Sequence, residues 1–365
     1  MVQMMIKNLY IHIPFCHSKC DYCAFFSITD TTDCDNFLKK LIADIEKSID
    51  LYGNKFETLY IGGGTPTLLR ENQLEFLFAQ LDKLLNLKNF KEISIESNPE
   101  TITREKLAII GNYANRLSMG VQSFNANLRQ ILGRNCSNQA IYQAIELINN
   151  SSIKNFNIDL IYAIPSQTIE DFEFDLEQVK KANAHHLSCY NLTIEEQTKL
   201  ASRDIVIDEN LAVELYQTAI NNPYYQQYEV SNYATSPEFQ CLHNKNIWQG
   251  DTLLGFGPAA SSFDGENRFT QSYSLIDYMQ DKNIDYDIIS PEERRNEIFA
   301  VNLRTCKGWE REIFEKKYPD TFDFYIEKIK ILAKVNPNFF DYSSNHIRLT
   351  PKGLLFWDEI ASELL

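Results

Sequence analysis

Short β-branched or aromatic runs alternate with longer segments of helical period through roughly the first 235 residues of the chain. The predicted strands span residues 9–13, 58–61, 92–96, 116–121, 157–162 and 186–192. Repeated strand-helix units build a parallel sheet, because neighbouring parallel strands need a crossover connection and this is usually a helix. The sequence therefore predicts an α/β fold with six strand-helix repeats.

Residues 236–365 have a different pattern. A glycine-bearing loop stretch covers about 241–268, charged helical segments follow, and a short run at 346–349 precedes Thr350 and Pro351. A threonine cap with a first-turn proline predicts a helix over 352–364. We expect a mainly helical second domain over 236–365 with a small β wing. It should pack tightly on a first domain over 1–235, because no low-complexity linker separates them.

Charge and hydropathy exclude several classes of protein. The chain has 35 Lys and Arg residues against 50 Asp and Glu residues and no Lys/Arg-rich run, so we expect no nucleic-acid partner. No stretch reaches the roughly 20 apolar residues that cross a bilayer, and the N-terminal residues are too polar for a signal peptide. The expected location is the cytoplasm, where the eight cysteines are thiols or metal ligands rather than disulfides.

Three cysteines lie close together directly after the first predicted strand. Cys16, Cys20 and Cys23 have the spacing C-x3-C-x2-C. A short loop with thiolates at these positions can hold three corners of a cubane iron-sulfur cluster, which leaves one iron free to bind a small molecule. The alternative is a zinc site formed by the same cysteines and His17, although zinc usually favours C-x2-C pairs with a distant second pair.

Small and polar residues lie in or just after several other predicted strands. The glycine run at 62–64 follows the second strand, where it either lets a ligand approach the backbone or forms a bare turn. Glu96, Gln122 and Asp159 lie in or after the third, fourth and fifth strands. Each alone could be a satisfied buried polar group. Because the carboxyl ends of barrel strands meet at one mouth, together they predict a ligand site there.

The most specific segments are YIHIPFC at 10–16, IGGGTP at 61–66, SIE at 94–96 and SMGVQSF at 118–124. They resemble motifs of the radical S-adenosylmethionine (SAM) family that includes the oxygen-independent coproporphyrinogen III oxidases. The segments NIDLIY at 157–162, SCYNL at 188–192, YEVSNY at 228–233, HNKNIW at 243–248 and LGFGP at 254–258 are similar to the haem chaperone branch of this family. The resemblance spans most of the chain.

The resemblance implies a partial (β/α)6 barrel in which Cys16, Cys20 and Cys23 ligate a 4Fe-4S cluster whose open iron binds SAM. One electron from the cluster then splits SAM into methionine and a 5′-deoxyadenosyl radical. The positions that match the family's SAM contacts are Tyr10, Tyr22, Gly63, Gly64, Thr65, Glu96, Gln122, Arg134 and Asp159. These residue types suit the ligand, because an arginine binds a carboxylate, a glutamate binds an ammonium group, and carboxyl and amide groups bind ribose hydroxyls.

Two positions separate the oxidases from the haem chaperones. Phe25 stands where the oxidases of the family carry a further cysteine, which favours the chaperones. His243 begins a segment similar to the HNxxYW motif associated with haem binding, and it is the candidate haem ligand. The alternative is a structural histidine, and Ile247 stands where that motif has tyrosine. The segment Ala259-Ala-Ser261 replaces the Gly-Ala-His of many relatives.

The resemblance thus implies a cytosolic haem chaperone. Such a protein binds a 4Fe-4S cluster, SAM and haem, receives an electron for the cluster from a donor, and passes haem to an acceptor protein such as one of the respiratory chain. One alternative is an oxygen-independent coproporphyrinogen III dehydrogenase, which converts two propionate side chains to vinyl groups with loss of carbon dioxide. Another is a zinc-stabilised binding module without redox chemistry.

Overall fold

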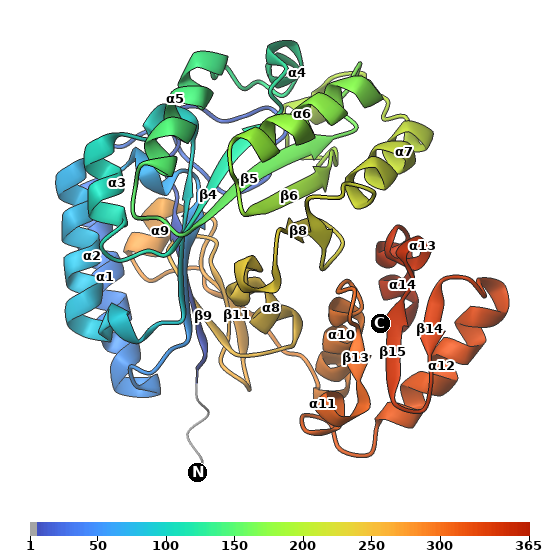
Figure 1. Cartoon of the computed structure of the whole chain (residues 1–365). Helices are drawn as coiled ribbons and strands as arrows, with labels where there is room; N and C mark the ends of the chain where they lie inside the picture. Colours follow the sequence, from blue (N-terminus) through green and yellow to red (C-terminus); the bar gives the residue numbers. More distant parts are fainter. Residues whose placement is uncertain (1–5) are drawn as a thin grey trace.

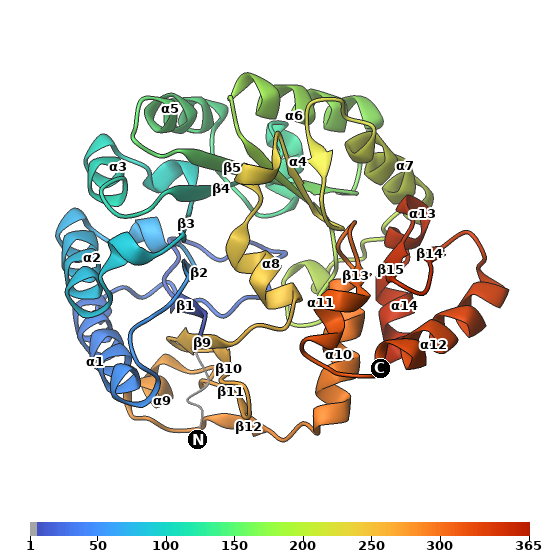
Figure 2. The same cartoon turned by 60° about the horizontal axis from the view of Figure 1, so that its bottom comes forward.

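The computed structural model describes residues 6–365. Its central feature is a 12-stranded sheet with the strand order β12-β11-β10-β9-β1-β2-β3-β4-β5-β6-β8-β7. The sheet curves into an open barrel, and helices surround it on the outside (Figures 1 and 2). The expected partial barrel of α/β type is confirmed.

The six predicted strands are all present as neighbouring parallel strands. They are β1 (Asn8–Ile13), β2 (Thr58–Gly63), β3 (Glu92–Ser97), β4 (Arg116–Gln122), β5 (Asn155–Tyr162) and β6 (His186–Asn191). The helices that follow them are α1 (Cys34–Tyr52), α2 (Glu71–Leu85), α3 (Arg104–Ile110), α4 (Ala126–Ile131), α5 (Asn138–Asn149), α6 (Ile169–Lys181) and α7 (Glu209–Ile220). Each crossover therefore returns the chain along the outer face of the barrel.

Alternation along each strand separates an apolar outer face from a polar inner face. In β1, Leu9, Ile11 and Ile13 are fully buried in the main hydrophobic core, to which α1 contributes its apolar face. Tyr10 and His12 alternate with them and therefore point to the other face. The strands thus bury their aliphatic side chains under the helices and present polar side chains to the barrel interior.

The sheet continues beyond residue 235. After β7 (Gln226–Gln227) and β8 (Asn232–Ala234), α8 (Leu242–Trp248) leads to β9 (Leu253–Phe256), which pairs in parallel with β1. The chain continues through β10 (Ser261–Phe263), β11 (Arg268–Thr270), α9 (Leu275–Met279) and β12 (Asp285–Asp287). The prediction of a loop over 241–268 was wrong, because a helix and two complete strands lie there.

Helix α8 lies inside the ring of outer helices, beside the amino-terminal ends of β1 and β2 (Figure 2). Asn246 donates to the Asn8 side chain at 2.9 Å. No side chain of the preceding segment caps α8; instead the Glu92 carboxylate of β3 accepts from the Leu242 and His243 backbone N–H groups at 2.7 and 3.1 Å. Since the cap comes from a strand 150 residues away, the local sequence lacks the usual start signal of a helix.

The C-terminal part has its own hydrophobic core and a 3-stranded antiparallel sheet, β13-β15-β14. Its elements are α10 (Pro291–Asn302), β13 (Trp309–Glu310), α11 (Arg311–Glu315), α12 (Phe322–Val335), β14 (Phe340–Tyr342), β15 (His346–Leu349), α13 (Pro351–Leu354) and α14 (Trp357–Leu364). The expected helical part with a small β wing is confirmed. This second core begins in α10, whereas β9–β12 extend the large sheet, and the domain boundary near 235 stays a prediction.

The helix predicted over 352–364 is interrupted. Thr350 caps it as expected, with its hydroxyl accepting from the Gly353 N–H at 3.1 Å. The helix then breaks at Phe356, whose ring stacks on Phe339 with centroids 4.9 Å apart.

Within residues 6–365, no helix is long and apolar enough to span a membrane.

Arg304 connects the C-terminal part to the barrel. Its guanidinium lies 4.9 Å from the ring centres of both Trp248 on α8 and Trp357 on α14. Its Nε donates to the fully buried Glu229 carboxylate at 2.7 Å. Cation-π contacts and a buried ion pair therefore meet at one residue between the two cores.

Ala259, in the turn between β9 and β10, has a left-handed backbone with φ of 61°. A side chain costs about 1–2 kcal/mol in this region, whereas glycine has a larger entropy cost of folding, about 0.5–1 kcal/mol. We expect Ala259→Gly to raise the free energy of unfolding by about 0.5–1 kcal/mol, measured by urea denaturation. The control Ala234→Gly, in strand β8, should lower it, and a destabilised Ala259→Gly would contradict this account.

Candidate functional site

The loop between β1 and α1 carries the three clustered cysteines as free thiols, each partly exposed. The loop is held at its base, because the Cys16 N–H donates to Ile28 O at 2.9 Å and the Ile28 N–H donates to Pro14 O at 2.8 Å. The Asp21 N–H donates to Leu132 O at 3.0 Å. Hydrogen bonds at the base of the loop and to Leu132 therefore hold the segment that carries the three sulfur atoms.

The glycine run brings the end of β2 against this loop. Gly63 has a φ of 112°, which favours glycine. A Cβ on Gly64 would lie 2.7 Å from Phe15 O and 3.0 Å from Cys16 Sγ. The hydroxyl of Thr65 lies 3.7 Å from Cys16 Sγ. The glycines therefore let the end of β2 approach the cysteine loop closely, and their contact with a ligand stays a prediction.

Glu96 lies at the end of β3, above the same glycines. Its carboxylate accepts from the Tyr60 hydroxyl at 2.8 Å and from the Gly63 N–H at 3.1 Å. Burial raises the pKa of Glu96 to about 7, and the Tyr60 hydrogen bond opposes this rise. A bound ammonium group would favour the charged carboxylate at this position.

Arg134 and Gln122 come from β4 and the segment that follows it. Arg134 donates to Gly120 O, and its Nη1 lies 3.9 Å from Cys20 Sγ. Its Nε is buried without a hydrogen-bond partner. The register of β4 on β5 shifts between Gly120 and Gln122, and Gln122 has a φ of 72°. This bulge redirects the Gln122 side chain, as bulges near binding sites do.

Asp159 on β5 faces the interior beside these residues. It accepts from Ser118 Oγ at 3.1 Å and from Asn157 Nδ2 at 2.7 Å. Burial raises its pKa, while these hydrogen bonds oppose the rise. A carboxylate with two neutral donors keeps lone pairs for ligand hydroxyls.

Of the two tyrosines of the predicted set, Tyr10 lies on β1 and Tyr22 lies in the cysteine loop itself. Tyr10 donates to His12 Nδ1 at 3.0 Å, and His12 Nε2–H donates to Phe26 O at 2.8 Å, which ties β1 to the loop. Burial lowers the pKa of His12, so the neutral tautomer makes both bonds. Tyr22 packs against a small apolar cluster that includes Leu128 and Leu132. Phe25 is 72% exposed.

The donor set fits an iron-sulfur cluster better than a single ion. Within residues 6–365, no group of three or more His, Cys, Asp or Glu side chains is arranged to hold one metal ion. In a cubane each thiolate binds a different iron, so the three sulfurs need not converge on one point. Three thiols on one pinned loop, with Gly64 in contact with Cys16, match that requirement.

His243 lies apart from the mouth. It is 5% exposed on α8, its Nδ1 is 2.8 Å from the Thr58 hydroxyl, and its ring centre is 5.2 Å from that of Tyr60. Burial lowers its pKa to about 3, with Arg116 adding to the effect. The imidazole is therefore neutral and faces the barrel interior below Glu96. Haem ligation by His243 stays a prediction.

The sequence analysis missed two buried polar residues, one at the mouth and one at the amino-terminal end of the sheet. Asn98, two residues after Glu96, bonds both Thr65 and Arg134. His186 at the start of β6 is fully buried between Asn157 and Tyr228. The alternation of polar residues along β3 could have revealed Asn98, because it shares the inner face with Glu96.

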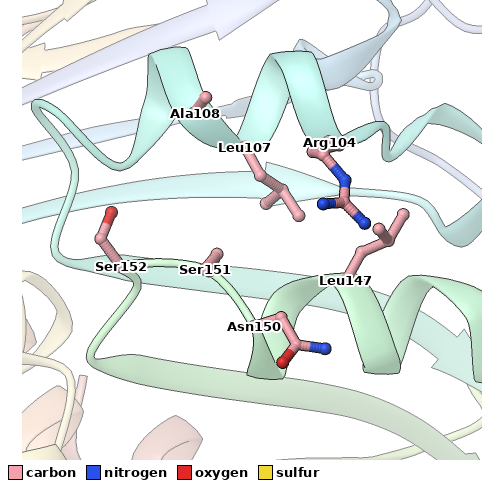
Figure 3. A pocket seen from close by; sticks show the side chains of 7 residues that line it. All are labelled: Arg104, Leu107, Ala108, Leu147, Asn150, Ser151 and Ser152. Atoms are coloured by element: carbon pink, nitrogen blue, oxygen red, sulfur yellow. The ribbon is translucent and has the colours of Figure 1, made fainter.

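A hollow of about 250 Å³ lies on the outer helices, away from the mouth. Its lining residues are Arg104, Leu107, Ala108, Leu147, Asn150, Ser151 and Ser152 (Figure 3). None of the predicted site residues lines it.

Known proteins share both the sequence and the fold. A model of the radical SAM superfamily matches residues 10–179. The heme chaperone HemW of Lactococcus lactis is 30% identical over 374 residues, which cover 98% of this chain and 97% of that protein. This chain belongs to the HemW heme chaperone family.

Further HemW proteins and one solved structure support this assignment. HemW of Escherichia coli is 35% identical over 268 residues, 71% of each chain. The structure of coproporphyrinogen III oxidase (HemN) from Escherichia coli, a radical SAM enzyme, has a TM-score of 0.82 and 26% identity and covers 99% of this chain and 90% of that one. The resemblance of the motifs to the radical SAM family and its haem chaperone branch is confirmed, and this chain shares its fold with HemN.

Proposed function

We propose that the chain is a haem chaperone that binds a 4Fe-4S cluster, SAM and haem and transfers haem to an acceptor protein. The observation that carries this proposal is the convergence of the cysteine loop, Gly64, Glu96 and Arg134 at one mouth, in a chain that matches HemW proteins over nearly its full length. Radical SAM proteins take their cluster and SAM at such a mouth.

The residues of the mouth have complementary chemistry for SAM. The Glu96 carboxylate would accept hydrogen bonds from the ammonium group, and Arg134, with its unpartnered buried Nε, would donate to the carboxylate. Gly63, Gly64 and Thr65 would receive the methionine part, and Gln122 and Asp159 the ribose. Tyr10 and Tyr22 would flank the ligand. When bound, the cluster supplies the electron that cleaves SAM, and these residues hold SAM in place and exclude water.

The partners of this function follow from its chemistry. The cluster needs a one-electron donor protein, and haem needs an acceptor, for which a haem protein of the respiratory chain is our candidate. We place the exchange in the cytoplasm. His243 is our candidate haem ligand, and access to it would require α8 to leave its position beside β1 and β2.

Oxygen-independent coproporphyrinogen III dehydrogenase is the second candidate. The HemN structure favours it, because that structure has a TM-score of 0.82 to this chain and covers 99% of it. Phe25 opposes it, since the oxidases of the family carry a cysteine at that position. The exposed Phe25 ring offers no sulfur to the substrate or to the cluster.

One anaerobic experiment separates the two functions. The chain with reconstituted cluster is given reductant, SAM and coproporphyrinogen III, and the same preparation is titrated with haem. We expect no protoporphyrinogen IX and one saturable haem per chain. Formation of protoporphyrinogen IX over many turnovers would establish the dehydrogenase instead. Iron and sulfide analysis of the preparation tests the zinc module, which would contain neither.

A further inference from the structure

Two hydrogen-bond donors face the sulfur atoms of the cysteine loop, and Asn98 joins them. Thr65 Oγ1 lies 3.7 Å from Cys16 Sγ, and Arg134 Nη1 lies 3.9 Å from Cys20 Sγ. Asn98 Nδ2 donates to Thr65 Oγ1 at 2.9 Å, and Asn98 Oδ1 accepts from Arg134 Nη2 at 2.5 Å. A continuous hydrogen-bonded chain therefore runs from Cys20 through Arg134, Asn98 and Thr65 to Cys16.

The direction of this chain is fixed by Arg134. A guanidinium has only donors, so the oxygen of the Asn98 amide faces it and the amide nitrogen faces Thr65. Thr65 Oγ1 accepts that N–H, and its own proton is left to point to Cys16 Sγ. Arg134 is itself held by Gly120 O, and the backbone oxygen of Asn98 accepts from the Thr101 hydroxyl at 2.9 Å. The backbone of Asn98 and the guanidinium of Arg134 are thus both held in place.

We propose that Asn98 is a positioning residue that sets the reduction potential of the iron-sulfur cluster by orienting Thr65 and Arg134 toward its ligand sulfurs. The inference rests on the proposed cluster at Cys16, Cys20 and Cys23. Hydrogen bonds to the ligand sulfurs stabilise the reduced cluster, which carries one more negative charge, and therefore raise its potential. Asn98 touches neither sulfur and acts through its two neighbours.

Asn98→Asp tests the direction of the hydrogen-bonded chain, because an aspartate has the same shape as the asparagine side chain. An aspartate accepts from both neighbours, so it takes the Thr65 proton away from Cys16 and adds a negative charge near the cluster. At a fixed solution potential, we expect the ratio of reduced to oxidised cluster to fall about tenfold, which is 59 mV for one electron. The measurement is an anaerobic redox titration followed by electron paramagnetic resonance, without SAM. Asn127→Asp, exposed on α4, controls for added charge.

Thr65 variants separate orientation from charge. Thr65→Val should lower the potential and Thr65→Ser should keep it, because only serine retains the donor to Cys16 Sγ. In the Thr65→Val background, Asn98→Asp should cause a smaller shift than it does alone. Equal shifts in both backgrounds, or a Thr65→Val potential equal to that of the unmodified chain, would overturn the inference. An unmodified chain that takes up no iron and sulfide would refute the proposed function instead.

Discussion

Replacing Cys16, Cys20 or Cys23 singly by alanine is expected to abolish the iron-sulfur cluster. Only three protein thiols hold the cluster in the proposed site, so each substitution leaves two corners without a ligand. After anaerobic reconstitution, each variant should lose the broad iron-sulfur absorption and bind less than a tenth of the iron and sulfide of the unmodified chain. The chain should still fold, because the three side chains are partly exposed and none belongs to a hydrophobic core.

Cys34→Ala is the matched control for these variants. Cys34 is buried at the start of α1 and belongs to the main core, apart from the cysteine loop. This variant should keep full iron and sulfide content, although it loses some stability. Unchanged cluster content in any of the three loop variants would defeat the ligand assignment.

Replacing Glu96 by glutamine is expected to weaken SAM binding about 100-fold. A hydrogen bond to a charged partner contributes about 1.5–3 kcal/mol, and glutamine keeps the shape of the side chain while removing its charge. The amide oxygen can still accept from the Gly63 N–H, and the amide nitrogen can donate to the Tyr60 hydroxyl, which now donates to the carboxylate, so the local structure should persist. Equilibrium binding of SAM to the reconstituted protein measures the effect. Glu105→Gln, exposed on α3, should bind SAM normally.

The pH profile of the same binding gives an independent measurement. Because burial raises the pKa of Glu96 to about 7, the carboxyl of the free protein becomes protonated and neutral as the pH falls through that value. SAM affinity should therefore fall from about pH 8 to about pH 6. Burial also raises the pKa of Asp159, which acts in the same direction. A profile equally steep in Glu96→Gln would show that another group is responsible.

Much of the barrel could be predicted because its strands carry local signals. In β1, Leu9, Ile11 and Ile13 alternate with polar residues and are fully buried under the outer helices. The capping box of α6 is likewise local, since Thr168 and Asp171 bond each other's backbone. Such features depend on neighbours in the sequence, and a single sequence shows them.

The elements after residue 235 depend instead on distant partners. Helix α8 is capped by Glu92 of β3, and β9 is only 4 residues long and contains Gly255. Four residues are too few for a clear periodicity, and β9 is stabilised by pairing with β1. These long-range contacts explain why the loop prediction for this stretch was wrong.

In the candidate site too, some residues are identified by local sequence signals and others only by their distant partners. Cys16, Cys20 and Cys23 are visible in the sequence because they share one loop. Asn98 is a single polar residue whose importance depends on Thr65 and Arg134, 33 and 36 residues away. The burial of His243 follows from the docking of α8, which the sequence did not predict. Spacing along the chain therefore identifies ligands on one loop but not side chains that act through others.

The pairing of β9 with β1 also determines when the large sheet can be completed during protein synthesis. Asn8 pairs with Leu253, so one edge of β1 has no partner until more than two thirds of the chain has been made. At about 5–20 residues per second, this interval lasts about 12–50 s. During that time the strand before the cysteine loop exposes an unpaired edge, a state prone to misassembly. The sheet edge beside the strand that leads into the cysteine loop is therefore completed only late in synthesis.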